Sequence, residues 1–241
     1  MAILTHGSDL SLSPTLTPMV RRSGGTVQAA LARLTRMGFG WVQLDATLAG
    51  IRPRELNQRA RKDLLALLNR QGIQAGGIDL FIPRRHYLSS QHVDRAVAAT
   101  IGAIELAADL GRLPLSLALP VQGLADDVRA ALVEAADGRG VRLAVHAEDQ
   151  AEALRSWVES VDLWTLGVAV DPAALLARGQ DPAAYVQRWG KRLAVARLSD
   201  LEAGGVVGEG DADAAGAVRC AVGQGELDLT SYRVAVDLAS G

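Results

Sequence analysis

Short apolar runs alternate along the chain with longer stretches in which apolar residues recur every three or four positions. The runs predict strands, because they are mostly apolar, as parallel strands covered on both faces are, rather than alternating. The stretches between them predict amphipathic helices, and Leu56, Ala60 and Leu64, for instance, would share one buried face. The predicted strands are 41–44, 73–82, 115–119, 141–145, 166–170 and 193–198.

Strand and helix alternate in spans of roughly 25–35 residues, the length of a βαβ unit. The pattern therefore predicts an α/β fold, a (β/α)8 TIM barrel formed by one domain over residues 1–241. A helix predicted over 27–37 needs a strand before it, near 3–4 or 10–12. No strand follows the last helix, 227–238. Either the first strand pairs unusually, the barrel is incomplete or open at its C-terminal, eighth strand, or the chain is shortened.

An open doubly wound sheet is the other architecture compatible with this alternation. No GxGxxG follows the first apolar residues, so a nucleotide-binding sheet would lack its main signature. Gly76 and Gly77 lie inside the strand predicted over 73–82, where a bulge is more common than a phosphate cradle. The pattern therefore favours the barrel.

Composition narrows the function classes. The chain has 25 basic and 27 acidic side chains, a formal charge of -2, which argues against nucleic acid or an anionic membrane as partner. Its one cysteine, Cys220, excludes a disulfide framework and zinc sites built on several thiolates, and it suggests a reducing compartment. No leader pattern or membrane-spanning run is present in the sequence. We therefore expect a cytoplasmic protein.

Polar residues placed directly after the apolar runs are the candidates for chemistry, because the reacting groups of a barrel lie at the carboxyl ends of its strands. Asp, Glu and His side chains that converge there could bind a divalent metal or transfer protons. The candidates are Asp45, Asp79, Arg84, Arg85, His86, Gln122, His146, Glu148, Asp149, Asp171, Arg197 and Asp200.

Several of these candidates also have a purely structural interpretation. Asp171 precedes Pro172 and could cap the following helix, as Asp181 does before Pro182. Glu148 could merely complement the positive end of its helix. His146 is harder to explain in this way, because a polar ring after a buried strand needs a partner there.

The chain resembles the xylose isomerase-like TIM barrels, the group of sugar and sugar-phosphate isomerases and epimerases related to the endonuclease IV fold. The resemblance covers about residues 38–238. The segments that carry it are DLFIPRRHYLSSQHVDRAVAATIGAIELAADLG, VDPAALLARGQDPAAYV, ARLSD and VGQGELDL.

This resemblance implies a divalent metal held by a Glu ending the fifth or sixth strand, an Asp followed three residues later by His, a His in an HLKD-like pattern and a last Glu. Those positions carry His146, Asp171, Ala174 and Arg197 here, and the last Glu has no counterpart. Glu148 could retain one ligand by exchange with His146. Ala174 offers no donor atom, and Arg197 would place a permanent positive charge beside the ion. We therefore expect no metal and no other cofactor.

The sequence thus predicts a sugar phosphate isomerase/epimerase-like barrel with a degenerate metal site that binds a small sugar-like or anionic molecule at the strand C-termini. Arg197 would hold the ligand's negative charge or pair with Asp171 or Asp200, and the binding set is Arg197, Asp171, Asp200, His146 and Glu148. Two alternatives stay open. One is a metal-independent isomerase or epimerase in which Glu148 or His146 abstracts a proton and Arg197 stabilises the enolate. The other is a non-catalytic scaffold; unpaired strand edges would favour a homo-oligomer.

Overall fold

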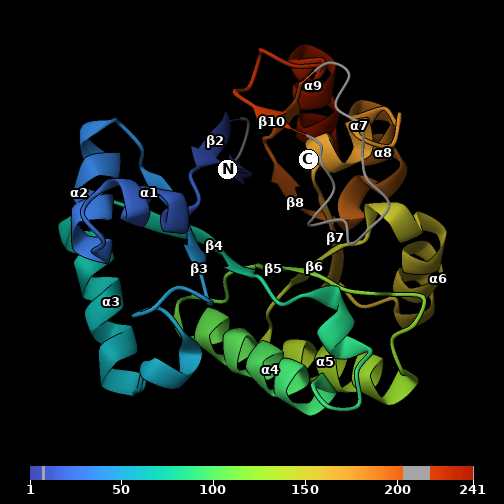
Figure 1. Ribbon diagram of the computed structural model, residues 1–241, viewed down its shortest axis with the longest axis horizontal. Helices are drawn as coiled ribbons and strands as arrows, with labels where there is room; N and C mark the ends of the chain where they lie inside the picture. The colour runs from blue at the N-terminus through green and yellow to red at the C-terminus, as the bar shows by residue number, and fades with distance from the viewer. Residues whose placement is uncertain (7–8, 203–217, 241) are drawn as a thin grey trace.

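The computed structural model describes residues 1–6, 9–202 and 218–240, in which strands and helices alternate (Figure 1). The strands are β1 (Ala2–His6), β2 (Asp9–Ser13), β3 (Trp41–Asp45), β4 (Gln74–Leu80), β5 (Leu115–Ala118), β6 (Leu143–His146), β7 (Leu166–Val170), β8 (Leu193–Arg197), β9 (Asp200–Leu201) and β10 (Arg219–Cys220). The helices are α1 (Leu16–Arg22), α2 (Val27–Arg36), α3 (Gln58–Arg70), α4 (Val93–Asp109), α5 (Asp126–Arg139), α6 (Ala151–Val161), α7 (Pro172–Leu176), α8 (Pro182–Trp189) and α9 (Leu229–Ser240).

Strands β3 to β8 are parallel and lie side by side in their order along the chain. They form a curled half-barrel, and α3 to α6 lie around its outside (Figure 1). This is the TIM-barrel-like α/β fold that the sequence predicts. Each of the six strands predicted from the apolar runs falls on one of these parallel strands.

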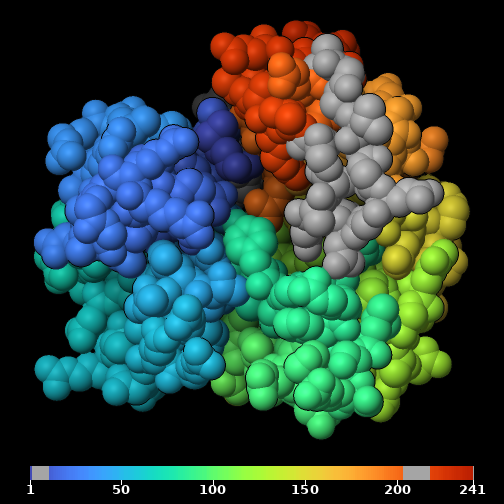
Figure 2. All heavy atoms as spheres, in the orientation of Figure 1, coloured from blue at the N-terminus to red at the C-terminus, as the bar shows by residue number. Residues whose placement is uncertain are grey.

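The N-terminal segment forms a hairpin that continues the sheet. Both candidate first strands exist, because β1 pairs antiparallel with β2 and, on its other side, antiparallel with β8. A single parallel bridge from Thr15 to Gln43 links the end of β2 with β3. The N-terminal strands therefore lie next to β8 (Figure 1). Figure 2, in the same orientation, shows the segments of α1 and α2 in blue and that of α9 in red on the upper part of the molecule. Two of the three explanations for the missing eighth strand agree with the structure: the first strand pairs unusually, and the parallel barrel is incomplete, because its six parallel strands form only a half-barrel.

Helix ends follow the local sequence. Thr26 and Asn57 accept hydrogen bonds from the first turns of α2 and α3, and Asp181 caps α8 as predicted. Helix α5 ends at Gly140, whose φ of 61° is left-handed and strained for other residues. None of the described helices combines the length and the apolar character that a membrane crossing needs.

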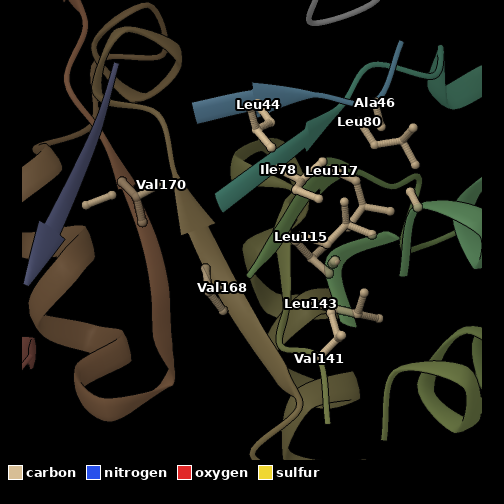
Figure 3. Close-up of a cluster of buried hydrophobic side chains, with 14 of the residues drawn as sticks. Leu44, Ala46, Ile78, Leu80, Leu115, Leu117, Val141, Leu143, Val168 and Val170 are labelled. Atoms are coloured by element: carbon tan, nitrogen blue, oxygen red, sulfur yellow. The ribbon is translucent and has the colours of Figure 1, made fainter. Parts of the chain in front are cut away.

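The hydrophobic core lies between the sheet and the surrounding helices (Figure 3). Leu44, Ile78, Leu115, Leu143 and Val168 come from five successive strands and are fully buried. Side chains alternate between the two faces of a strand, so the residues between these point to the inside of the half-barrel.

The inner face of the sheet carries polar and small side chains. Gln43, Asp79 and Ser116 are buried there. The predicted bulge in β4 is confirmed, since the register with β3 shifts at Gly76. A Cβ on Gly77 would lie 2.8 Å from the amide of Gln43, so glycine leaves the room that this side chain fills. The inner face thus supplies the floor of a polar site.

Candidate functional site

A cavity of about 510 Å³ lies at the carboxyl ends of β4 to β8. Its wall includes His146, Glu148, Asp171 and Arg197, which are four of the five residues that the sequence predicts for binding. The parallel strands bring them together, because their carboxyl ends share one edge of the sheet.

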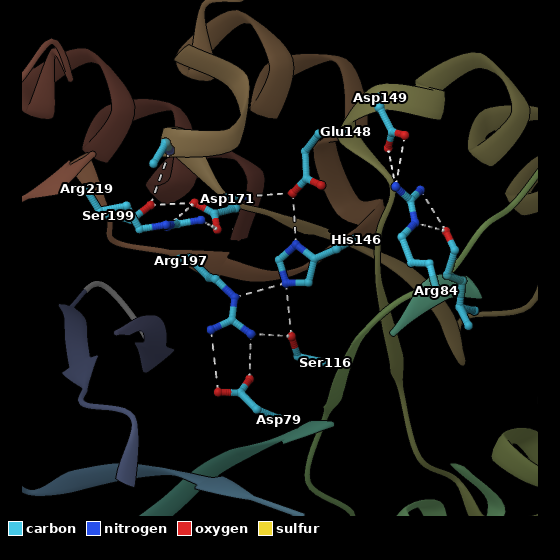
Figure 4. Close-up of polar contacts among 12 residues, drawn as sticks. Asp79, Arg84, Ser116, His146, Glu148, Asp149, Asp171, Arg197, Ser199 and Arg219 are labelled. Atoms are coloured by element: carbon cyan, nitrogen blue, oxygen red, sulfur yellow. Dashed lines mark hydrogen bonds and ion pairs between the residues drawn. The ribbon is translucent and has the colours of Figure 1, made fainter. Parts of the chain in front are cut away.

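The guanidinium of Arg197 lies at the centre of the polar contacts (Figure 4). Its Nη2 donates to Asp79 Oδ1 at 2.8 Å and to the Ser116 hydroxyl at 3.1 Å, and its Nε donates to His146 Nε2 at 3.0 Å. The side chains of Arg197 and Asp79 are 13% and 1% exposed. Burial by itself would lower the pKa of Arg197, but the neighbouring carboxylates, Asp79 first, outweigh it and raise the pKa. Arg197 is thus a permanent cation in the floor of the cavity.

Hydrogen bonds on both ring nitrogens fix His146. Because Arg197 Nε can only donate, His146 Nε2 must accept, and the ring proton is assigned to Nδ1. Nδ1 donates to Glu148 Oε1 at 2.9 Å, and the same oxygen accepts the backbone N–H of Asp171 at 2.9 Å. Glu148 is therefore the partner that a polar ring at the end of a buried strand requires.

Asp171 follows β7, and its side chain does not cap α7, so the capping interpretation is wrong. Oδ1 accepts from the Ser199 hydroxyl at 2.5 Å and from Arg219 Nη1 at 3.1 Å, and Oδ2 accepts from Arg219 Nη2 at 2.7 Å. Burial alone would raise the pKa of Asp171, but the hydrogen bonds and charge of Arg219 outweigh it and hold the pKa well below its usual range.

Asp200, the fifth predicted binding residue, is not brought to the cavity wall. It is fully buried, and its carboxylate accepts the backbone N–H groups of Gly223, Gly225 and Leu227 at 2.9–3.0 Å. The structure therefore places Asp200 against the segment between β10 and α9.

Arg84 joins three loops at the edge of the cavity (Figure 4). Its Nη1 donates to both carboxylate oxygens of Asp149 at 2.8 and 2.9 Å, and its Nε and Nη2 donate to the Leu119 carbonyl at 3.0 and 2.9 Å. The planar guanidinium of Arg84 thus holds the loops after β4, β5 and β6 together.

Three further strand-end candidates make structural contacts away from the cavity. Asp45 accepts the backbone N–H of Thr47 at 2.7 Å, and the ring of His86 lies 4.9 Å from that of His92. The backbone N–H of Gln122 donates to the side chain of Gln150 at 2.9 Å. None of these three candidates is part of the described cavity wall.

No protein-family model matches the chain, and no curated protein matches its sequence. Solved structures match its fold. A xylose isomerase domain protein from Planctomyces limnophilus is 16% identical, with a TM-score of 0.68 over 86% of this chain and 80% of that one. A xylose isomerase-like TIM barrel protein from Mycobacterium smegmatis, in complex with magnesium, is 14% identical, with a TM-score of 0.67 over 95% and 86% of the two chains. The fold is that of the xylose isomerase-like TIM barrels.

A sugar epimerase shares this fold as well. The D-allulose 3-epimerase from Methylomonas sp., in complex with D-allulose, is 14% identical, with a TM-score of 0.65 over 100% of this chain and 84% of its own. Identities this low establish the xylose isomerase-like fold and leave the chemistry to be argued from the cavity itself.

The resemblance to xylose isomerase-like barrels implies a divalent metal, and the side chains of this cavity do not fit one. Ala174 presents a methyl group to the cavity, both nitrogens of His146 are engaged, and Asp171 is bound by Arg219. Within the described ranges, no group of three His, Cys, Asp or Glu residues could hold a metal ion. The charge in the floor is the guanidinium of Arg197, which offers no coordination position for a substrate oxygen.

Four residues of this site lie outside the binding set predicted from the sequence, although Asp79 was among the strand-end candidates. Asp79 pairs with Arg197, so the predicted pairing of Arg197 with Asp171 or Asp200 is wrong. Asp79 could have been recognised because it is a charged residue inside an apolar run, and burying its charge is costly unless a counter-charge lies beside it. Ser116 carried the weaker signal of a hydroxyl on the same inner face. Ser199 directly follows the apolar run 193–198 and so carried the same strand-end signal as the candidates, whereas Arg219 carried none, because it reaches the cavity from β10, far along the chain. The four are Asp79, Ser116, Ser199 and Arg219.

Proposed function

We propose that this protein binds a small sugar-like or anionic metabolite in the cavity at the strand carboxyl ends, with Arg197 in place of a metal cation. The cavity has the size of small-molecule sites and gathers convergent polar groups. The D-allulose 3-epimerase with the same fold supports a sugar-like ligand.

The placement of Arg197 is the observation that carries the proposal. Nε and Nη2 are engaged by His146, Ser116 and Asp79, whereas Nη1 makes only a 3.5 Å contact with Asp79 within the part of the chain that the structure describes. Donors of Nη1 therefore remain for a hydroxyl, carboxylate or phosphate oxygen of a ligand. The ring of Phe81 lies 5.7 Å from the Arg197 guanidinium carbon and is 54% exposed, which adds an apolar surface for the carbon face of a sugar.

A metal-independent epimerase is the second candidate. His146 is poorly suited as its base, because the lone pair of Nε2 already accepts from Arg197. Glu148 is better suited: Oε1 accepts two hydrogen bonds, and Oε2 has no hydrogen-bond partner among the described residues. Glu148 Oε2 is therefore the atom that would take a proton from a substrate.

Ligand-induced thermal stabilisation tests the proposal. D-Allulose, other neutral ketohexoses and sugar phosphates are screened, and at least one is expected to raise the melting temperature. Arg197→Lys keeps the charge opposite Asp79 but not the planar fork, so it should lose most of that shift. Asp126→Asn, at an exposed carboxylate on α5, is the matched control and should keep the shift. No shift with any compound favours the scaffold and overturns the proposal, as does stoichiometric tightly bound manganese, zinc or magnesium in the purified protein.

Turnover separates binding from catalysis. Incubation with each stabilising sugar, followed by chromatography of the products, should return the sugar unchanged if the protein only binds it. Epimerised product that is lost in Glu148→Gln, while the thermal shift persists, would replace the binding proposal with the metal-independent epimerase.

A further inference from the structure

Residues 218–227, here called the strap, contain β10 and lead toward α9, which begins at Leu229. The strap is paired with β9, Arg219 with Leu201 and Cys220 with Asp200. The backbone N–H of Glu226 also donates to the Leu201 carbonyl at 3.0 Å. These bonds fix the register in which the strap passes the cavity.

The strap is fastened to the carboxylate of Asp200. Oδ2 accepts from Gly223 N at 2.9 Å and from Gly225 N at 3.0 Å, and Oδ1 accepts from Leu227 N at 2.9 Å. Asp200 is completely buried, so three backbone donors of one segment converge on a charge that has no access to water. A Cβ on Gly225 would overlap the Leu201 carbonyl, so the strap approaches β9 too closely for any other residue.

The other end of the strap enters the cavity. Arg219 lines the cavity wall, and its two terminal nitrogens donate to the two carboxylate oxygens of Asp171 at 3.1 and 2.7 Å. Its side chain is 54% exposed, against 13% for Arg197. The backbone position of Arg219 is set by the pairing with Leu201, next to Asp200.

We infer that Asp200 is a positioning residue, which holds Arg219 against Asp171 through the strap. Arg219 is in turn the group at this wall of the cavity that determines which ligands bind. The part that concerns ligands rests on the proposed function. The part that concerns Asp200 rests on the hydrogen bonds of the strap alone.

Cys220 provides a direct readout, because it is the only cysteine of the chain and lies half-buried opposite Asp200. Labelling of the native protein with Ellman's reagent should be at least tenfold faster in Asp200→Asn, since the amide group would oppose N–H donors with N–H donors. Gly225→Ala should give a similar acceleration with the Asp200 carboxylate intact. Asp228→Asn, which alters a carboxylate at the start of α9 that binds Ser231, is the control and should label like the parent protein.

A second readout follows Arg219 itself. Both terminal nitrogens of Arg219 are bound to Asp171, so side-chain nitrogen NMR should show its Nη protons as resolved signals, assigned by their loss in Arg219→Lys. Those signals should collapse in Asp200→Asn and in Gly225→Ala and persist in Asp228→Asn. A merely structural role would leave them unchanged wherever circular dichroism and melting temperature show an intact fold.

Unchanged Cys220 labelling together with unchanged Arg219 signals in both strap variants would overturn the positioning role. If Asp200→Asn does not fold, Gly225→Ala carries the test. Neither readout needs a ligand, so this failure is distinguishable from a failure of the sugar screen, which would leave the strap bonds untouched.

Discussion

Two arginine–aspartate pairs belong to the same site, yet they are built in opposite ways. Arg197 and Asp79 come from strands β8 and β4 and are almost fully buried, at 13% and 1% exposure. Arg219 and Asp171 meet at the wall, with 54% and 13% exposure, and Arg219 is brought there by the strap. A buried pair leaves an uncompensated charge when one partner is lost, whereas water replaces a lost partner near the surface. The first pair therefore stabilises the fold as well as forming the floor of the cavity, whereas the second contributes mainly to the cavity wall.

The largest effect is expected when the buried pair is broken. Asp79→Asn leaves the guanidinium of Arg197 without its counter-charge inside the half-barrel, which should cost about 3–5 kcal/mol of unfolding free energy. Urea denaturation followed by circular dichroism measures this loss. Asp45→Asn is the matched control on the neighbouring strand, because Asp45 is buried but binds threonine groups, and it should cost only about 1–2 kcal/mol. Equal losses in the two variants would contradict the comparison.

Acid should destabilise the folded protein in part through Asp171. Its pKa lies below the usual 3.8, so its ionised form stabilises the folded state at neutral pH, and this contribution is lost as the pH falls below about 4. We expect the unfolding free energy to decline as the pH falls below about 4. Asp171→Asn should be less stable at pH 7 and should show a shallower decline. Parallel pH profiles for the two proteins would count against the ionised pair.

The smallest effect is expected at the exposed partner. Arg219→Ala should change the unfolding free energy by no more than about 1 kcal/mol, because the Arg219 side chain is 54% exposed and Asp171 keeps Ser199 as a donor. The same urea titration checks this value. A loss as large as that of Asp79→Asn would show that the wall, too, is part of the folding core.

The fold was predictable from the sequence because its signal is repeated. Six apolar runs separated by amphipathic stretches predict the parallel strands, and each additional strand–helix unit strengthens the prediction of a βα repeat. The hairpin of β1 and β2 was only partly predictable, since antiparallel pairing with β8 depends on which edge is available rather than on local pattern.

The site was predictable only where a strand carries the residue to the cavity. His146 and Arg197 stand at the ends of apolar runs, so their convergence follows from parallel topology. The partner of Arg197 could not be chosen, because several acidic residues end strands and only the curvature of the sheet selects Asp79. Asp200 was misplaced for a related reason: its carboxylate follows the same strand as Arg197, but it faces the strap.

The antiparallel direction of β1 has a practical consequence for handling the protein. Ala2 pairs with Arg197, so the strand starts at the end of the sheet where the cavity opens, and Met1 is part of the cavity wall. Any affinity tag fused ahead of Met1 would emerge at the opening and compete with a solute for entry.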